Sequence, residues 1–107
     1  MKQITPVALA AWLADASRSK PLLLDVREPW EFQTCSIAGS RHVPMGEIPA
    51  RAGELDAAAE VVVICHHGGR SMQVAVFLEK NGFSKVRNLA GGVDAWAKSV
   101  DPKMPLY

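Results

Sequence analysis

The feature that most constrains the fold is a run of β-branched residues from Glu60 to Cys65 (EVVVIC). Its apolar residues do not alternate with polar ones, which is typical of a strand buried on both faces of a parallel sheet. Gly68-Gly69 follows at once, and a helix is predicted from about Arg70 to Lys80. This pattern predicts a strand–loop–helix unit. In folds built from such units, ligands bind beyond the carboxyl ends of the strands.

The rest of the chain repeats the alternation of strands and helices. Thr5-Pro6 is typical of a helix start, and the helix is predicted to end near Ala16. The remaining predicted segments are strands over 21–26, 40–43 and 86–89, a short helix from Glu28-Pro29, an irregular helical connection over 46–56 broken by Pro49 and Gly53, a helix end at Asn81-Gly82, and a last helix after Gly91-Gly92. Three tryptophans, Trp12, Trp30 and Trp96, are predicted to pack in the core. The pattern predicts an α/β fold with a mostly parallel sheet and helices on both faces.

Length and composition bound the function. A chain of 107 residues without an internal linker predicts one domain over 1–107. A net charge of +1 offers no basic face, so no nucleic-acid partner is expected. The longest apolar run is too short for a membrane span, and no signal peptide is apparent. The two cysteines, Cys35 and Cys65, are too few for a disulfide framework. We therefore expect a cytoplasmic protein with free thiols.

The segment from Cys65 to Ser71 (CHHGGRS) places a thiol between a buried strand and a predicted helix. Gly68 and Gly69 permit the backbone angles that turn the N–H groups of a short loop inward. The positive end of the helix adds to the same spot, so the sequence predicts an anion cradle that stabilises the Cys65 thiolate. Arg70 supplies a guanidinium suited to an oxyanion such as thiosulfate. The alternative is a structural role for Cys65, as a small apolar side chain ending a core strand.

Two histidines, His66 and His67, follow the cysteine directly. An imidazole there could hydrogen bond to a substrate, but adjacent residues are predicted to point in different directions, and loop histidines are often solvated. No C-x-x-C or H-x-x-x-H spacing occurs, so no metal site is predicted. The loop also lacks the G-x-x-x-x-G-K pattern that binds nucleotide phosphates.

Three segments in order resemble the rhodanese family over essentially the whole chain. Leu24 to Phe32 (LDVREPWEF) is similar to the family's D-V-R-x-x-x-E-[FY] segment. Cys65 to Ser71 is similar to its active loop, Cys-x-x-x-x-Arg followed by Ser. Gly82 to Trp96 is similar to its closing pattern, G-F-x-x-V-x-N-L-x-G-G-x-x-A-W. The chain departs from the family between Cys35 and Ser40, where G-H-I-P-G-A is common, and at His42, a place often held by Asn.

The resemblance implies a rhodanese-like fold, with a five-stranded parallel sheet flanked by helices. It also implies a thiosulfate sulfurtransferase that needs no cofactor. Cys65 matches the nucleophile that carries sulfur as a persulfide, and the loop from His66 through His67, Gly68 and Gly69 to Arg70, with Ser71, matches the substrate cradle. The implied donor is a small sulfur-containing anion or a persulfide, and the implied acceptor is cyanide, a thiol or a protein.

Other interpretations stay open at this point. A sulfur carrier or partner-binding module without turnover needs the same persulfide. A phosphatase or arsenate reductase can use a related Cys/Arg loop on the same fold, although such phosphatases place five residues, rather than four, between Cys and Arg. Asp25 and Arg27, together with Glu31, are expected to support the site through a buried pair rather than by direct chemistry, because buried charges are rarely left unpaired.

Overall fold

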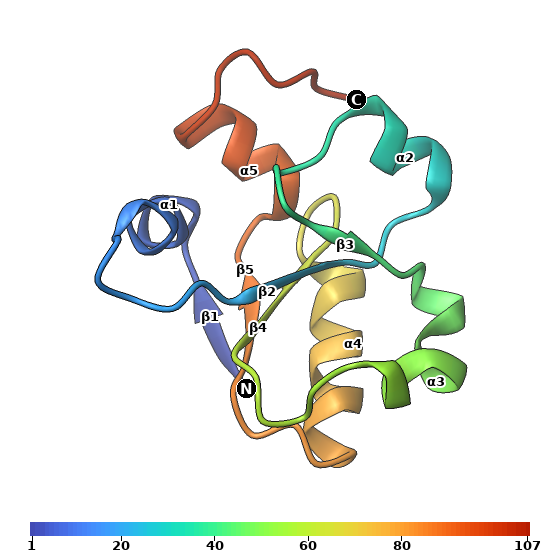
Figure 1. Ribbon diagram of the computed structural model, residues 1–107. Coiled ribbons are helices and arrows are strands. Elements are labelled where there is room, and N and C mark those ends of the chain that lie inside the picture. Colours follow the sequence, from blue (N-terminus) through green and yellow to red (C-terminus); the bar gives the residue numbers. More distant parts are fainter.

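A computed structural model describes all residues from Met1 to Tyr107. Its elements are β1 (Lys2–Ile4), α1 (Pro6–Ala14), β2 (Leu22–Asp25), α2 (Pro29–Thr34), β3 (Arg41–His42), the 3-10 turn η1 (Met45–Glu47), α3 (Ile48–Arg51), the 3-10 turn η2 (Ala52–Glu54), β4 (Val61–Ile64), α4 (Gly69–Lys80), β5 (Val86–Leu89) and α5 (Gly92–Ser99). The strands form one sheet in the order β1-β5-β4-β2-β3, and every neighbouring pair is parallel. The predicted α/β fold with five strands is confirmed (Figure 1).

The central strand β4 shows why the sheet needs helices on both faces. Val61 and Val63 pack with side chains of α3 and α4, whereas Val62 and Ile64 pack with side chains of α1 and α5. All four are fully buried. Because side chains alternate along a strand, an unbroken apolar run is stable only when both faces are covered. Burial of each such side chain contributes roughly 1.5–3 kcal/mol.

The helices covering the sheet begin and end close to their predicted positions. The Thr5 side chain accepts a hydrogen bond from the Ala8 N–H at 3.1 Å, which confirms the predicted start of α1. This helix ends at Ala14, two residues before the predicted end. Gly82, with a φ of +94°, follows α4, as the Asn81-Gly82 pair indicated.

Two features differ from the sequence-based predictions. Strand β1 was not predicted from the sequence, because Lys2–Ile4 is a short, largely exposed edge strand without an apolar run. Trp30 is wrongly predicted to be a core residue. Trp12 and Trp96 are buried, but Trp30 is 61% exposed and its ring packs edge-on against Tyr107. It belongs to the short helix α2, which covers the carboxyl end of the sheet instead of one of its faces (Figure 1).

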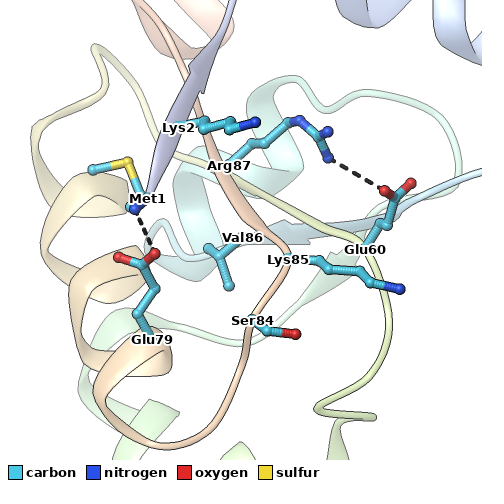
Figure 2. A pocket seen from close by; sticks show the side chains of 8 residues that line it. All are labelled: Met1, Lys2, Glu60, Glu79, Ser84, Lys85, Val86 and Arg87. Atoms are coloured by element: carbon cyan, nitrogen blue, oxygen red, sulfur yellow. Dashed lines mark ion pairs between the residues drawn. The ribbon is translucent and has the colours of Figure 1, made fainter.

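A hollow lies at the amino end of the sheet, opposite to the carboxyl ends of the strands (Figure 2). Two ion pairs line it: Arg87 lies 3.7 Å from Glu60, and the Met1 amine pairs with Glu79. It contains no cysteine or histidine, so the thiols and imidazoles of the chain lie elsewhere. None of the helices has the length and apolar character that crossing a membrane would require.

Candidate active site

The loop that follows β4 is built by close approach to α5. Gly68 has a φ of +103° and precedes the first residue of α4, which lets the chain turn sharply from strand to helix. The Val93 N–H donates to the Cys65 carbonyl at 2.9 Å, and the Asp94 N–H donates to the His66 carbonyl at 3.1 Å. A Cβ atom on Gly92 would lie 2.3 Å from the Cys65 carbonyl oxygen. The amino end of α5 therefore holds the loop, and glycine is required for that contact.

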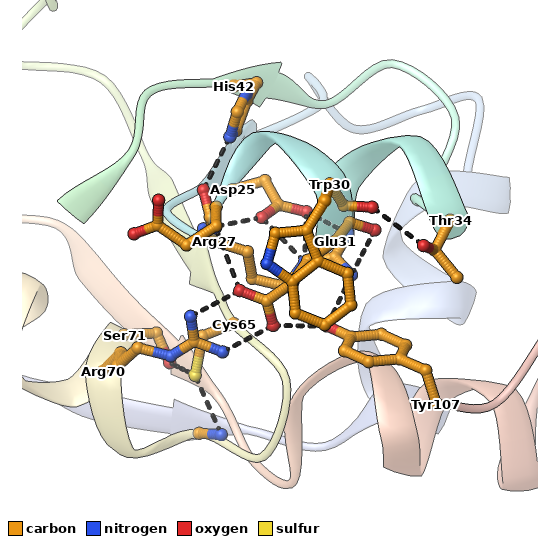
Figure 3. Close-up of polar contacts among 12 residues, drawn as sticks. Asp25, Arg27, Trp30, Glu31, Thr34, His42, Cys65, Arg70, Ser71 and Tyr107 are labelled. Carbon is orange, nitrogen blue, oxygen red and sulfur yellow. Dashed lines mark hydrogen bonds and ion pairs between the residues drawn. The ribbon is translucent and has the colours of Figure 1, made fainter.

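Neutral hydrogen-bond donors surround the sulfur atom of Cys65. The Gly68 N–H lies 3.0 Å from Sγ, and the Ser71 hydroxyl lies 3.2 Å from it (Figure 3). Cys65 is 1% exposed, and Ser71 is fully buried. Since Cys65 also lies just before the amino end of α4, these groups stabilise negative charge on the sulfur.

The Ser71 hydroxyl is itself positioned by Asn88 at the end of β5. Asn88 Nδ2 donates to the Gly68 carbonyl at 3.1 Å and to Gln3 Oε1 at 3.0 Å. These bonds leave Asn88 Oδ1 directed at the Ser71 hydroxyl. The hydroxyl carries one hydrogen, so it donates either to Asn88 or to Cys65 Sγ. Asn88 and Gln3 were not singled out from the sequence as site residues, because their roles depend on the pairing of β1 with β5.

Arg70 lies at the mouth of the loop and has a carboxylate partner. Its guanidinium donates to Glu31 Oε1 at 2.6 Å and to Oε2 at 2.8 Å (Figure 3). The hydrogen bonds from Arg70 lower the pKa of Glu31 from 4.5 to about 2, against the opposing effect of burial. The sequence placed Arg70 at the site as an oxyanion-binding cation, but the structure shows a guanidinium already bound by a carboxylate from α2.

The predicted Asp25–Arg27 pair is present at the end of β2. Both side chains are fully buried, and Arg27 Nη2 lies 2.8 Å from Asp25 Oδ2. Arg27 also donates to the Cys35 carbonyl at 2.6 Å and to the Glu31 carbonyl at 3.2 Å. The pair thus holds the carboxyl-terminal half of α2, the helix that carries the partner of Arg70.

Tyr107 joins these groups and was missed by the sequence analysis. Its hydroxyl donates to Glu31 Oε2 at 2.8 Å and accepts from Arg27 Nη1 at 2.9 Å. Its ring stacks on that of His66, with centroids 3.9 Å apart. Burial raises the pKa of Tyr107 to about 12. Nothing near Tyr107 in the sequence marks it as a site residue, because all of its partners come from distant segments.

The two histidines of the loop lie together, so the prediction that they point in different directions is wrong. Their ring centroids are 3.9 Å apart. The loop curls ahead of Gly68, so neighbouring side chains do not alternate as they do in a strand. Burial lowers the pKa of His66, whose Nε2 atom is buried and has no hydrogen-bond partner.

A possible set of metal ligands arises from the same cluster. Ligand atoms of His66, His67 and Asp94 lie within 4.8 Å of one another. The spacing rules applied to the sequence did not include Asp94, which comes from α5. Its carboxylate is bound by Lys98 at 2.9 Å, which competes with any ion for this oxygen.

Comparison with known proteins places this geometry in a family. The model of the rhodanese-like domain matches residues 9–99. A sulfurtransferase of Allochromatium vinosum is 36% identical over 98 residues, which cover 92% of this chain and 90% of that protein. A putative sulfur carrier protein, YrkF of Bacillus subtilis, is 38% identical over 94 residues, which cover 87% of this chain and 51% of that protein.

Solved structures agree with these relatives. A rhodanese-like domain protein from Staphylococcus aureus superposes with a TM-score of 0.85 at 28% identity, covering 100% of this chain and 99% of that one. The chain spans about half or less of the length of several curated relatives it matches. The matched residues include the cysteine loop, Gly92, which contacts it, and Glu31, which binds Arg70. The chain belongs to the rhodanese-like domain family.

Proposed function

We propose that this protein is a sulfurtransferase that moves sulfane sulfur from thiosulfate or a persulfide donor to cyanide or a thiol acceptor through a Cys65 persulfide. The observation that carries the proposal is the pair of polar groups within hydrogen-bond distance of Cys65 Sγ, the Gly68 N–H at 3.0 Å and the Ser71 hydroxyl at 3.2 Å, which donates to the sulfur when its hydrogen turns away from Asn88. Such donors stabilise both a thiolate and the terminal sulfur of a persulfide. The similarity to a named sulfurtransferase supports the same chemistry.

The reaction is a double displacement at sulfur. The Cys65 thiolate attacks the outer sulfur of the donor, the donor's S–S bond breaks, and the electron pair of that bond leaves with the rest of the donor. With thiosulfate the leaving group is sulfite, and Cys65 keeps one extra sulfur. Cyanide or a thiolate then attacks this terminal sulfur, which departs as thiocyanate or as a new persulfide and returns Cys65 to the thiolate.

The roles of the loop residues follow from their positions. In this scheme the Gly68 N–H and the Ser71 hydroxyl hold the Cys65 sulfur, and the other N–H groups of the loop from His66 to Gly69 receive the terminal sulfur of the persulfide. His67 and Arg70 lie at the mouth, where donor and acceptor pass. Asp25 and Arg27 support the site by fixing α2 and act on no reacting atom. The chemistry uses no metal and no organic cofactor in this scheme.

A sulfur carrier is the second candidate, because a putative sulfur carrier is among the relatives. A carrier and an enzyme form the same persulfide and differ in turnover. Here the acceptor of a carrier would be a protein thiol, and small acceptors such as cyanide would discharge Cys65 slowly.

The test is loading and turnover on the same sample. After mixing with a sulfane-sulfur donor, the intact mass should rise by one sulfur atom, and cyanide should remove that atom as thiocyanate. Repeated turnover indicates an enzyme, and a single discharge indicates a carrier. The proposal fails if the protein never gains sulfur but hydrolyses an aryl phosphate, since that result identifies a phosphatase.

A further inference from the structure

The cationic side chains around the cysteine loop are all engaged by carboxylates. The pairs are Arg70–Glu31 at 2.6 Å, Arg27–Asp25 at 2.8 Å and Lys98–Asp94 at 2.9 Å. The charges of the site therefore largely cancel, and the loop presents dipoles rather than an uncompensated positive charge.

The Arg70–Glu31 pair cannot open freely to receive an anion. The Glu31 side chain is 4% exposed, and it also accepts hydrogen bonds from the Tyr107 hydroxyl at 2.8 Å and the Glu28 N–H at 3.0 Å. These bonds hold the carboxylate in place when the guanidinium turns away. A buried carboxylate without its cation is strongly unfavourable, so the pair resists any donor that requires Arg70 for itself.

Thiosulfate and an organic persulfide meet this site differently. Thiosulfate brings two negative charges toward the Cys65 thiolate and the Glu31 carboxylate, and no unpaired cation offsets the repulsion. A thiol persulfide, R–S–SH, carries its outer sulfur on an organic group. Rings provide an apolar surface for such a group beside the ion pair. Trp30 is 61% exposed, and its ring packs against Tyr107 (Figure 3). The ring of Tyr107 also stacks on that of His66.

We infer that, within the proposed sulfurtransferase function, the site is built for an organic thiol persulfide as donor and discriminates against thiosulfate. In the loading step the Cys65 thiolate attacks the outer sulfur of R–S–SH. The S–S bond of the donor breaks, its electron pair stays on the inner sulfur, and R–S⁻ leaves. Cys65 then carries –S–SH with the donor's hydrogen, so that atoms and charge balance. Glu31 is a positioning residue in this selection between donors, because it holds the Arg70 guanidinium and touches no reacting atom.

The test compares rate constants for loading Cys65 from thiosulfate and from the persulfide of 2-mercaptoethanol, followed by intact mass. The rate constant with the persulfide is divided by the rate constant with thiosulfate. This ratio is then divided by the same ratio measured for free cysteine, which removes the intrinsic reactivity of the donors. The wild-type protein should favour the persulfide by about a hundredfold after this correction. E31Q should raise relative use of thiosulfate about tenfold, because it removes the charge and keeps the side-chain size.

The matched control is E60Q, which removes the same charge in the hollow at the other end of the sheet (Figure 2). It should leave the ratio unchanged within about twofold, because salt screens distant charges. The salt dependence of loading gives a second test, on the unmodified protein. Added salt should speed loading from thiosulfate if repulsion limits it, and should slow it if a free cation attracts this donor.

The outcomes separate the two proposals. A wild-type protein that loads from thiosulfate as well as from the persulfide, and more slowly as salt is added, overturns the donor assignment and leaves the sulfurtransferase intact. An unchanged ratio in E31Q, with persulfide loading showing that the variant is folded, also overturns it. Failure of both donors to load Cys65 would instead count against the proposed function.

Discussion

Cys65 and Cys35 are both buried and free, yet their surroundings differ in kind. Cys65 lies just before the amino end of α4, and its sulfur lies within hydrogen-bond distance of two neutral groups, the Gly68 N–H and the Ser71 hydroxyl. Cys35 lies at the carboxyl end of α2, and the polar atom near its sulfur is Arg27 Nη1, at 3.8 Å. Helix dipoles favour negative charge at the first position and disfavour it at the second. We do not expect Arg27 to activate Cys35 as a nucleophile, because this guanidinium is already paired with Asp25.

The largest effect should come from exchanging each cysteine for serine. Cys65→Ser should abolish sulfur loading and thiocyanate formation, because a hydroxyl stays protonated and cannot carry sulfane sulfur. Cys35→Ser is the matched control and should retain both within about twofold, because the Cys35 sulfur contacts Arg27 and no group of the cysteine loop. A disulfide between the two cysteines, trapped during turnover, would break this comparison and give Cys35 a resolving role.

The second prediction tests whether the ion pair between Glu31 of α2 and Arg70 stabilises the fold. The pKa of Glu31 falls from 4.5 to about 2 through its bonds with Arg70. A lowered pKa stabilises the folded state above the unfolded value and is lost as pH falls through the folded value. We expect urea unfolding of the wild type to lose up to about 3 kcal/mol between pH 5 and pH 2, relative to E31Q. A constant difference between the two proteins over this range would contradict the ion-pair account.

A smaller effect tests the neutral donors on the Cys65 side. Ser71→Ala removes the hydroxyl at 3.2 Å from Sγ and should slow sulfur loading about tenfold, the value of one hydrogen bond to a charged atom. Ser84→Ala, on the exposed surface of the hollow at the amino end, should have no effect. Equal rates for Ser71→Ala and the wild type would mean that the Gly68 N–H alone suffices.

The smallest expected effect concerns the Tyr107 hydroxyl, which hydrogen bonds to both Glu31 and Arg27. Tyr107→Phe keeps the ring stacked on His66 and removes the hydroxyl that joins Glu31 to Arg27. We expect a loss of about 1 kcal/mol in the free energy of unfolding, measured by urea titration at pH 7. Tyr107→Ala should cost more, because it also removes the ring contacts. Equal losses in the two variants would show that the hydroxyl, rather than the ring, carries the contribution of Tyr107.

The same contrast explains how much could be predicted from the sequence. The nucleophile side is built from contiguous residues: a buried strand, two glycines and a helix start lie within Val61 to Ser71, so local patterns predicted it. The charged side joins Glu31, Arg70 and Tyr107, which are distant in sequence, and no periodicity connects them. The edge strand β1 was missed for a related reason, because its place is set by pairing with β5 rather than by an apolar pattern.

The most direct test of the central claim locates the transferred sulfur in the unmodified protein. After loading from an organic persulfide and removal of excess donor, peptide mapping by mass spectrometry should find one added sulfur atom on the peptide containing Cys65 and none on the peptide containing Cys35. Cyanide should then remove it in an amount equal to the thiocyanate released. Sulfur on Cys35, or no sulfur on either cysteine under conditions that load free thiols, would contradict the account.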